Sequence, residues 1–118
     1  MELRRGQLYK IVPTNLDNHD YFKAKYGKNP IIMLEDQDVN LWKGGWKANM
    51  HIMACALFGM RLWLAGVTSA DNVYYGKVNG MGELVHKSEL KELTKRELDA
   101  YLKKYGLTEH DIKVQEVI

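Results

Sequence analysis

The stretch from Val73 to Leu93 reads VYYGKVNGMGELVHKSELKEL, and it decides the fold. Its first part, Val73–Val78, has the β-branched and aromatic residues that favour a strand. The next two residues, Asn79-Gly80, form the strongest short hairpin signal in the chain, because both central residues of a type I′ turn need positive φ. Glu83–Lys87 then returns as the partner strand. The stretch therefore predicts an antiparallel β-hairpin.

Two further strands are expected before this hairpin. Gly6–Val12 (GQLYKIV) has strand composition and is ended by Pro13, which cannot donate to a sheet. Pro30 opens a compact apolar run, IIMLE, which is a second strand candidate. Thr14–Asp20 has the composition of a loop.

Two helices are expected before residue 60, and one further strand is expected from residue 60 onward. Asp20–Tyr26 predicts a short helix with Asp20 as its N-cap and Gly27 as its stop. Lys47–Phe58 is dense in Ala, Met and Leu and predicts a buried central helix, although its second half would also suit a strand. Met60–Val67 (MRLWLAGV) reads as a strand.

The C-terminal part carries clear helix punctuation. Thr94 and Glu97 match a capping box, in which each side chain accepts from the other residue's backbone N–H. Gly106 stands where a left-handed residue ends a helix. Ile112–Ile118 begins with strand-like alternation and predicts an edge strand. The predicted helix presents one apolar stripe, formed by Leu98, Tyr101, Leu102 and Tyr105.

A strand with a mid-strand glycine, a tight turn, a second strand and a short Ser-Glu-Leu turn into another strand resembles the closing half of an SH3-like small β-barrel. Gly6–Val12 resembles its opening strand. The chain lacks the acidic, tyrosine-rich first-loop motif of the SH3 domains that bind proline-rich peptides, and it inserts a helix in the middle. The resemblance implies a domain that binds peptides, proteins or nucleic acids through exposed aromatic residues between its loops, without enzymatic activity.

Length and composition predict one α+β domain over residues 1–118. Residues 1–93 would form a small, bent antiparallel sheet of SH3-like character with the inserted central helix, and residues 94–118 a C-terminal helix and strand. A chain of 118 residues needs no metal or disulfide to fold. Its single cysteine, Cys55, is consistent with a reducing cytoplasm. Met50–Val67 is apolar, but Arg61 near its middle argues against a membrane span.

The best candidate for a contact surface is the aromatic and basic loop WKGGWK. It consists of Trp42, Lys43, Gly44, Gly45, Trp46 and Lys47. Lysines attract phosphate or carboxylate, tryptophans stack or fill pockets, and glycines let the backbone approach a partner. Arg61 and Tyr75 are further candidates for the same surface. In the alternative interpretation, the tryptophans cap the core and the lysines are merely solvated.

Other polar groups are weaker candidates. Glu35, Asp36 and Asp38 supply oxygens that could hold a hard cation or dock a basic partner, but a solvated strand end is the default interpretation. His51 and Cys55 share a helical spacing in an apolar setting that keeps a thiol neutral, so core packing is favoured over catalysis. No metal site and no cofactor are therefore expected.

The leading hypothesis is a non-enzymatic, cytoplasmic binding module that occupies a protein partner through the loop. Its compact, motif-free character suggests an inhibitor or adaptor from a phage or mobile element. One alternative is nucleic-acid binding through the same surface, although the net charge of +2 is mild. Another is a small-molecule-binding or catalytic protein. If Val117 and Ile118 are exposed on an edge strand, they would permit a homodimer.

Overall fold

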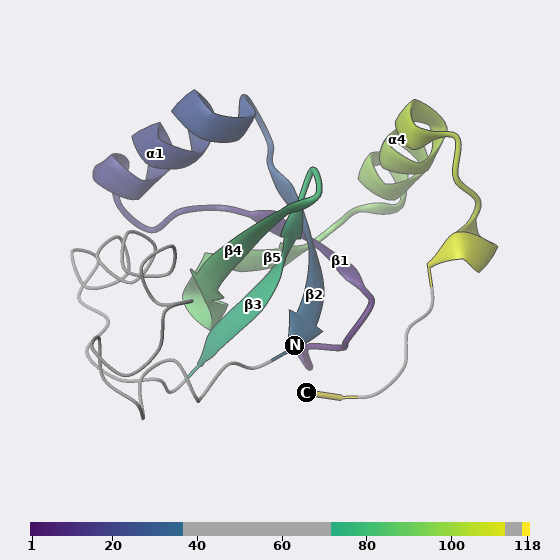
Figure 1. Ribbon diagram of the computed structural model, residues 1–118, viewed down its shortest axis with the longest axis horizontal. Coiled ribbons are helices and arrows are strands. Elements are labelled where there is room, and N and C mark those ends of the chain that lie inside the picture. The colour runs from purple at the N-terminus through teal and green to yellow at the C-terminus, as the bar shows by residue number, and fades with distance from the viewer. Residues whose placement is uncertain (37–71, 113–116) are drawn as a thin grey trace.

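The computed structural model describes residues 1–36, 72–112 and 117–118, which form an α+β fold (Figure 1). Its antiparallel sheet is open and has the strand order β4-β3-β2-β1-β5. The strands are β1 (Leu8–Ile11), β2 (Ile31–Asp36), β3 (Val73–Val78), β4 (Met81–His86) and β5 (Leu90–Glu92). The strands predicted near residues 6–12, 30–35 and 73–87 are thereby confirmed, and β4 begins and ends slightly earlier than expected.

The β3–β4 hairpin has the predicted turn. Asn79 and Gly80 have φ values of 51° and 81°, as a type I′ turn requires. The register places Tyr75 opposite Leu84 and Gly76 opposite Glu83. Since paired residues share a face of the sheet, Gly76 and Glu83 lie side by side.

A short 3-10 turn, η1 (Lys87–Glu89), joins the two edge strands. In a flat five-stranded sheet these edges would lie about 19 Å apart. The chain from His86 to Leu90 reaches at most about 14 Å when fully extended. The sheet must therefore curl, which agrees with the bent sheet expected from the sequence. Ser88 N–H donates to His86 Nδ1, and His86 N–H donates to the buried Glu89 carboxylate.

The helix α1 (Leu16–Tyr26) begins earlier than the sequence predicted. Its N-cap is Asn15, whose side-chain oxygen accepts from the Asn18 N–H at 2.9 Å, so Asp20 lies inside the helix rather than at its start. The interpretation of residues 14–20 as a loop holds for residues 14–15 and was wrong from Leu16 onward, because a good N-cap stands at Asn15. Gly27 ends the helix as predicted, at a φ of 83°.

The core lies between α1 and the face of the sheet that α1 covers (Figure 1). Phe22 of α1 packs there with alternate residues of the strands, as a period of two requires. Those strand residues are Tyr9, Ile11, Ile32, Leu34, Tyr74, Val78, Val85 and Leu90. Burial raises the pKa of the Tyr9 and Tyr74 hydroxyls above the ordinary value of 10.0.

The helix α4 (Lys95–Tyr105) follows β5 and has both predicted caps. Thr94 and Glu97 form the capping box, and Gly106 is left-handed with a φ of 65°. Leu107 N–H donates to the Leu102 carbonyl at 2.8 Å, which completes a Schellman ending. Lys10 of β1 pairs with Glu97 at 3.0 Å and ties α4 to the sheet.

The two ends of the described chain meet (Figure 1). Val117 forms an antiparallel bridge with Arg4, and Ile118 N–H donates to the Leu3 carbonyl at 2.9 Å. Val117 is half exposed, whereas Ile118 packs against the core, so the two residues do not form a joint exposed edge. The central helix predicted over 47–58, the strand over 60–67 and most of the predicted C-terminal strand lie outside the described residues. Neither α1 nor α4 has the length and apolar character to cross a bilayer.

Candidate functional site

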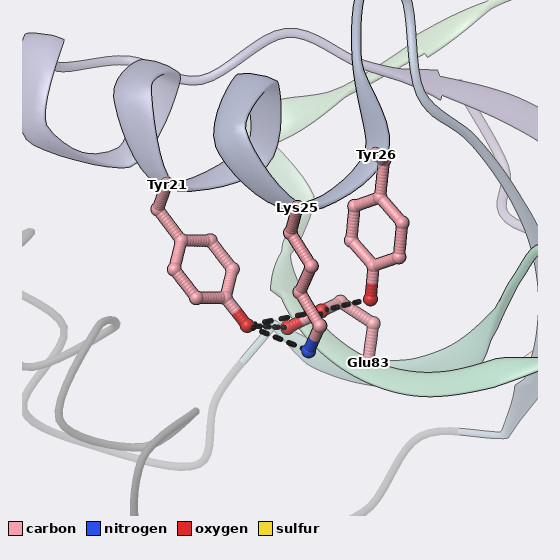
Figure 2. Close-up of polar contacts among 4 residues, drawn as sticks. All are labelled: Tyr21, Lys25, Tyr26 and Glu83. Atoms are coloured by element: carbon pink, nitrogen blue, oxygen red, sulfur yellow. Dashed lines mark hydrogen bonds and ion pairs between the residues drawn. The ribbon is translucent and has the colours of Figure 1, made fainter.

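A buried carboxylate joins α1 to the sheet. Glu83 of β4 has no exposed surface, and three side chains of α1 converge on it (Figure 2). The Tyr26 hydroxyl donates to Glu83 Oε2 at 2.6 Å, the Tyr21 hydroxyl donates to the same oxygen at 3.2 Å, and Lys25 Nζ lies 3.6 Å from it. A buried charge is costly unless it is paired and hydrogen-bonded, and this arrangement meets both conditions.

Glu83 with Tyr21, Lys25 and Tyr26 forms what we call the Glu83 cluster. This cluster holds α1 in place and keeps its carboxylate away from solvent. Glu83 offers no surface that a solute could reach, and the Lys25 side chain is only a quarter exposed. Lys25 Nζ also donates to the Tyr21 hydroxyl at 3.1 Å, so the cluster is linked within α1 as well as to β4. It therefore holds the C-terminal half of α1 against the sheet and positions the turn that follows, Gly27–Pro30.

This turn separates two adjoining grooves. The first groove has a volume of about 330 Å³ and lies between the end of β1 and α1. The second has a volume of about 300 Å³ and lies between the turn, Asn79 of the hairpin and α4. Lys28, Asn29 and Pro30 line both grooves, so the two form one continuous surface.

Lysines and tyrosines give this surface its character, and we call it the lysine–tyrosine tract. Lys23 and Lys28 line the first groove, and Lys28 and Lys104 the second. Three aromatic rings line the second groove, those of Tyr26, Tyr101 and Tyr105. Five separate segments contribute described lining residues: the end of β1, α1, the α1–β2 turn with the start of β2, the hairpin tip and α4.

The tract has an excess of positive charge. Within the described residues, no carboxylate lies within ion-pair distance of Lys23, Lys28 or Lys104. The one carboxylate among the described groove linings is Glu97, and Lys10 already pairs with it. The local field therefore favours a negatively charged partner.

Tyr105 is the most exposed aromatic ring of the tract, with 42% of its surface accessible. Its hydroxyl donates to Asn79 Oδ1 at 2.8 Å, and its ring centroid lies 4.6 Å from that of Tyr101. Lys104 Nζ lies 5.4 Å from the Tyr105 centroid. Burial, and then the neighbouring Tyr105, raise the pKa of Tyr101 above its ordinary value of 10.0. Tyr105 is thus partly exposed, and its ring is held by the bond from its hydroxyl to Asn79 and by its contacts with Tyr101 and Lys104.

The sequence-predicted loop does not coincide with this surface. Trp42, Lys43, Gly44, Gly45, Trp46, Lys47 and Arg61 all lie outside the described residues, so their role stays a prediction. Tyr75 is described and lies on the face of the sheet opposite its buried neighbour Tyr74, because successive strand residues point to opposite faces. The Tyr75 ring packs over Gly82, and Lys77 Nζ lies 5.8 Å from its centroid.

The acidic cluster and the histidines supply no metal site in the part of the chain that the structure covers. No three His, Cys, Asp or Glu side chains gather there in a way that could hold a metal ion. Glu35 is exposed at the end of β2, whereas Asp38, His51 and Cys55 lie outside the described residues.

Sequence reasoning missed the tract because its residues are far apart in the chain. Tyr101 and Tyr105 were expected only in an apolar helix stripe. Only the packing of α4 beside the α1–β2 turn brings them to Lys28. A usable signal was the excess of lysine and tyrosine near the ends of both helices, in KAKYGKN (23–29) and YLKKYG (101–106).

Comparisons with known protein families, curated proteins and solved structures found no match to this chain.

Proposed function

We propose that this chain is a non-enzymatic binding domain that occupies a macromolecular partner, and that the lysine–tyrosine tract is part of its contact surface. The observation that carries the proposal is one continuous surface with three lysines that have no carboxylate partner in the described chain and with three tyrosine rings. Lysines attract negative charge and aromatic rings supply broad contact area, a combination that suits recognition. Both helices that carry the tract are anchored to the sheet by buried or paired carboxylates.

The proposal includes an SH3-like arrangement of the sheet. Its support is the run of β3, tight turn, β4, η1 and β5, together with the pairing of β1 with β5. This is the order of elements on which the sequence resemblance rests. Small barrels of this kind commonly bind partners through aromatic residues between their loops, and the tract has that composition.

The loop Trp42–Lys47 remains a second proposed contact element, with Arg61 and Tyr75 as further proposed contributors. Its aromatic and basic composition matches that of the tract. In the sequence-based hypothesis the partner is a protein, and nucleic acid is the alternative.

Charge reversal within the tract tests this function. Immobilised wild-type protein is compared with the Lys28→Glu, Lys104→Glu double variant for capture of macromolecules from a cell lysate. A matched control, Lys87→Glu, Lys95→Glu, makes the same change in net charge at two exposed lysines that line neither groove. We expect wild type and control to capture the same partner and the tract variant to lose it. Equal capture by all three would show that the tract is not the contact surface.

A further inference from the structure

We infer that the occupant of the lysine–tyrosine tract is single-stranded nucleic acid. Its phosphates would lie against Lys23, Lys28 and Lys104, and one of its bases would stack on Tyr105. This inference rests on the proposed binding function and names the partner of the same surface.

Charge is the first argument. The three lysines follow one another across the two grooves, and Lys28 belongs to both. Because no carboxylate of the described chain neutralises them, they present a row of positive charge that matches the repeated charge of a phosphate backbone. Glu97, the one carboxylate among the described lining residues, is already paired with Lys10 and adds little repulsion.

The exposed Tyr105 ring favours a single strand over a duplex. Bases in a duplex are stacked on one another, whereas a single strand can place a base face on an exposed ring. Tyr105 offers such a ring, and Asn79 and Tyr101 hold it in place before a ligand arrives. Because the ring is already ordered, binding costs less side-chain entropy.

The same ring argues against an acidic peptide as the occupant. Carboxylates could pair with the lysines, but they would leave the partly exposed Tyr105 ring without a flat partner. Each nucleotide supplies an anionic phosphate and a flat aromatic base. In the second groove, Lys104 would contact the phosphate and the neighbouring Tyr105 would contact the base.

The first experiment measures binding of fluorescently labelled single-stranded oligonucleotides, of DNA and of RNA, by anisotropy over a range of salt concentrations. The duplex of the same sequence and a poly-glutamate chain are competitors. Lys28→Gln, Lys104→Gln removes two charges without reversing them, and Lys87→Gln, Lys95→Gln is the matched control. We expect the slope of log affinity against log salt to become shallower by about 1.4 in the tract variant, about 0.7 for each lost phosphate contact, and to stay unchanged in the control.

A second pair of variants tests stacking. Tyr105→Phe keeps the ring and removes the hydroxyl, whereas Tyr105→Ser removes the ring. We expect Tyr105→Ser to weaken single-strand binding by about fivefold or more, and Tyr105→Phe to weaken it by less than that. Circular dichroism and thermal unfolding confirm that each variant is folded.

Three results would overturn the inference. In the first, wild type does not bind single strands. In the second, it binds them, but the tract and Tyr105 variants bind them equally well. In the third, poly-glutamate competes as strongly as the unlabelled single strand does. In the last case an acidic polypeptide is the occupant, and the proposed binding function survives. That function fails separately, when tract charge reversal leaves every captured partner in place.

Discussion

Glu83 is the residue on which the position of α1 depends most directly, since its buried carboxylate accepts from Tyr21 and Tyr26 and faces Lys25. Glu83→Gln keeps the shape but removes the charge that these groups face. We expect the free energy of unfolding to fall by about 1–3 kcal/mol. Urea denaturation measures it, as a lower midpoint at an unchanged slope.

Glu92→Gln is the matched control for this substitution, because Glu92 is exposed on β5. Its effect should stay within about 0.5 kcal/mol of wild type. Equal midpoints for the two variants would show that the Glu83 cluster does not anchor α1.

Glu97 makes the stability of α4 depend on pH. The Thr94 backbone N–H and then the Lys10 ammonium lower the pKa of this carboxyl below its ordinary value of 4.5. A pKa that is lower in the folded state stabilises the fold above the ordinary value, and this contribution is lost as the pH falls below 4.5 through the folded-state pKa. Glu97→Gln should therefore unfold at a lower temperature than wild type at neutral pH, and the gap should narrow in acid. A gap that is constant across the pH series would refute this account.

At the scale of the secondary-structure elements, we expect alanine at two glycines of the β3–β4 hairpin to lower the free energy of unfolding by different amounts. A Cβ at Gly76 would meet the Met33 carbonyl oxygen and would lie 2.6 Å from Ile32 Cγ1, in the neighbouring strand β2. A Cβ at Gly82 would lie 2.5 Å from the Tyr75 hydroxyl, the far end of a side chain that can rotate. We expect Gly76→Ala to lower the free energy of unfolding by about 1–3 kcal/mol, and Gly82→Ala to lower it by less. Chemical denaturation of the pair tests this order, and a reversed order would contradict the register of β2 and β3.

Local signals in the sequence predicted some elements and failed for others. The Asn79-Gly80 turn and the caps of α4 depend on neighbouring residues alone, so the sequence could predict them. The start of α1 was missed because both Asn15 and Asp20 are good N-cap residues, and only tertiary packing, with Asn18 and Phe22 buried, selects the earlier one.

At the scale of the whole molecule, the two chain ends support each other. Ile118 packs against the core and its N–H donates to the Leu3 carbonyl, whereas Val117 is half exposed. We expect Ile118→Ala to lower the free energy of unfolding by about 1–3 kcal/mol and Val117→Ala to lower it by less. Thermal and urea unfolding of the two variants would contradict this arrangement if Val117→Ala proved the more costly.

One sequence alone could not predict that the residues of the candidate site lie together. Lys28 and Tyr105 are brought to one groove by the order of the strands, by the Lys10–Glu97 pair and by the contact between Tyr105 and Asn79. None of these long-range contacts has a local signature. The α+β class and the bent antiparallel sheet were predictable because they follow from strand and turn patterns, whereas the cytoplasmic location, the mobile-element origin and the role of Trp42–Lys47 stay predictions.

The central claim is that the partner is contacted through the lysine–tyrosine tract, and amide chemical-shift mapping by NMR tests it most directly. A single-stranded oligonucleotide is titrated into isotope-labelled protein. The account predicts that the largest shifts fall on residues 23, 27–31, 79 and 100–106, and that the amide signals of η1 stay unchanged. Large shifts confined to residues 42–47, with the tract unmoved, would contradict the account and place the contact at the loop that the sequence first indicated.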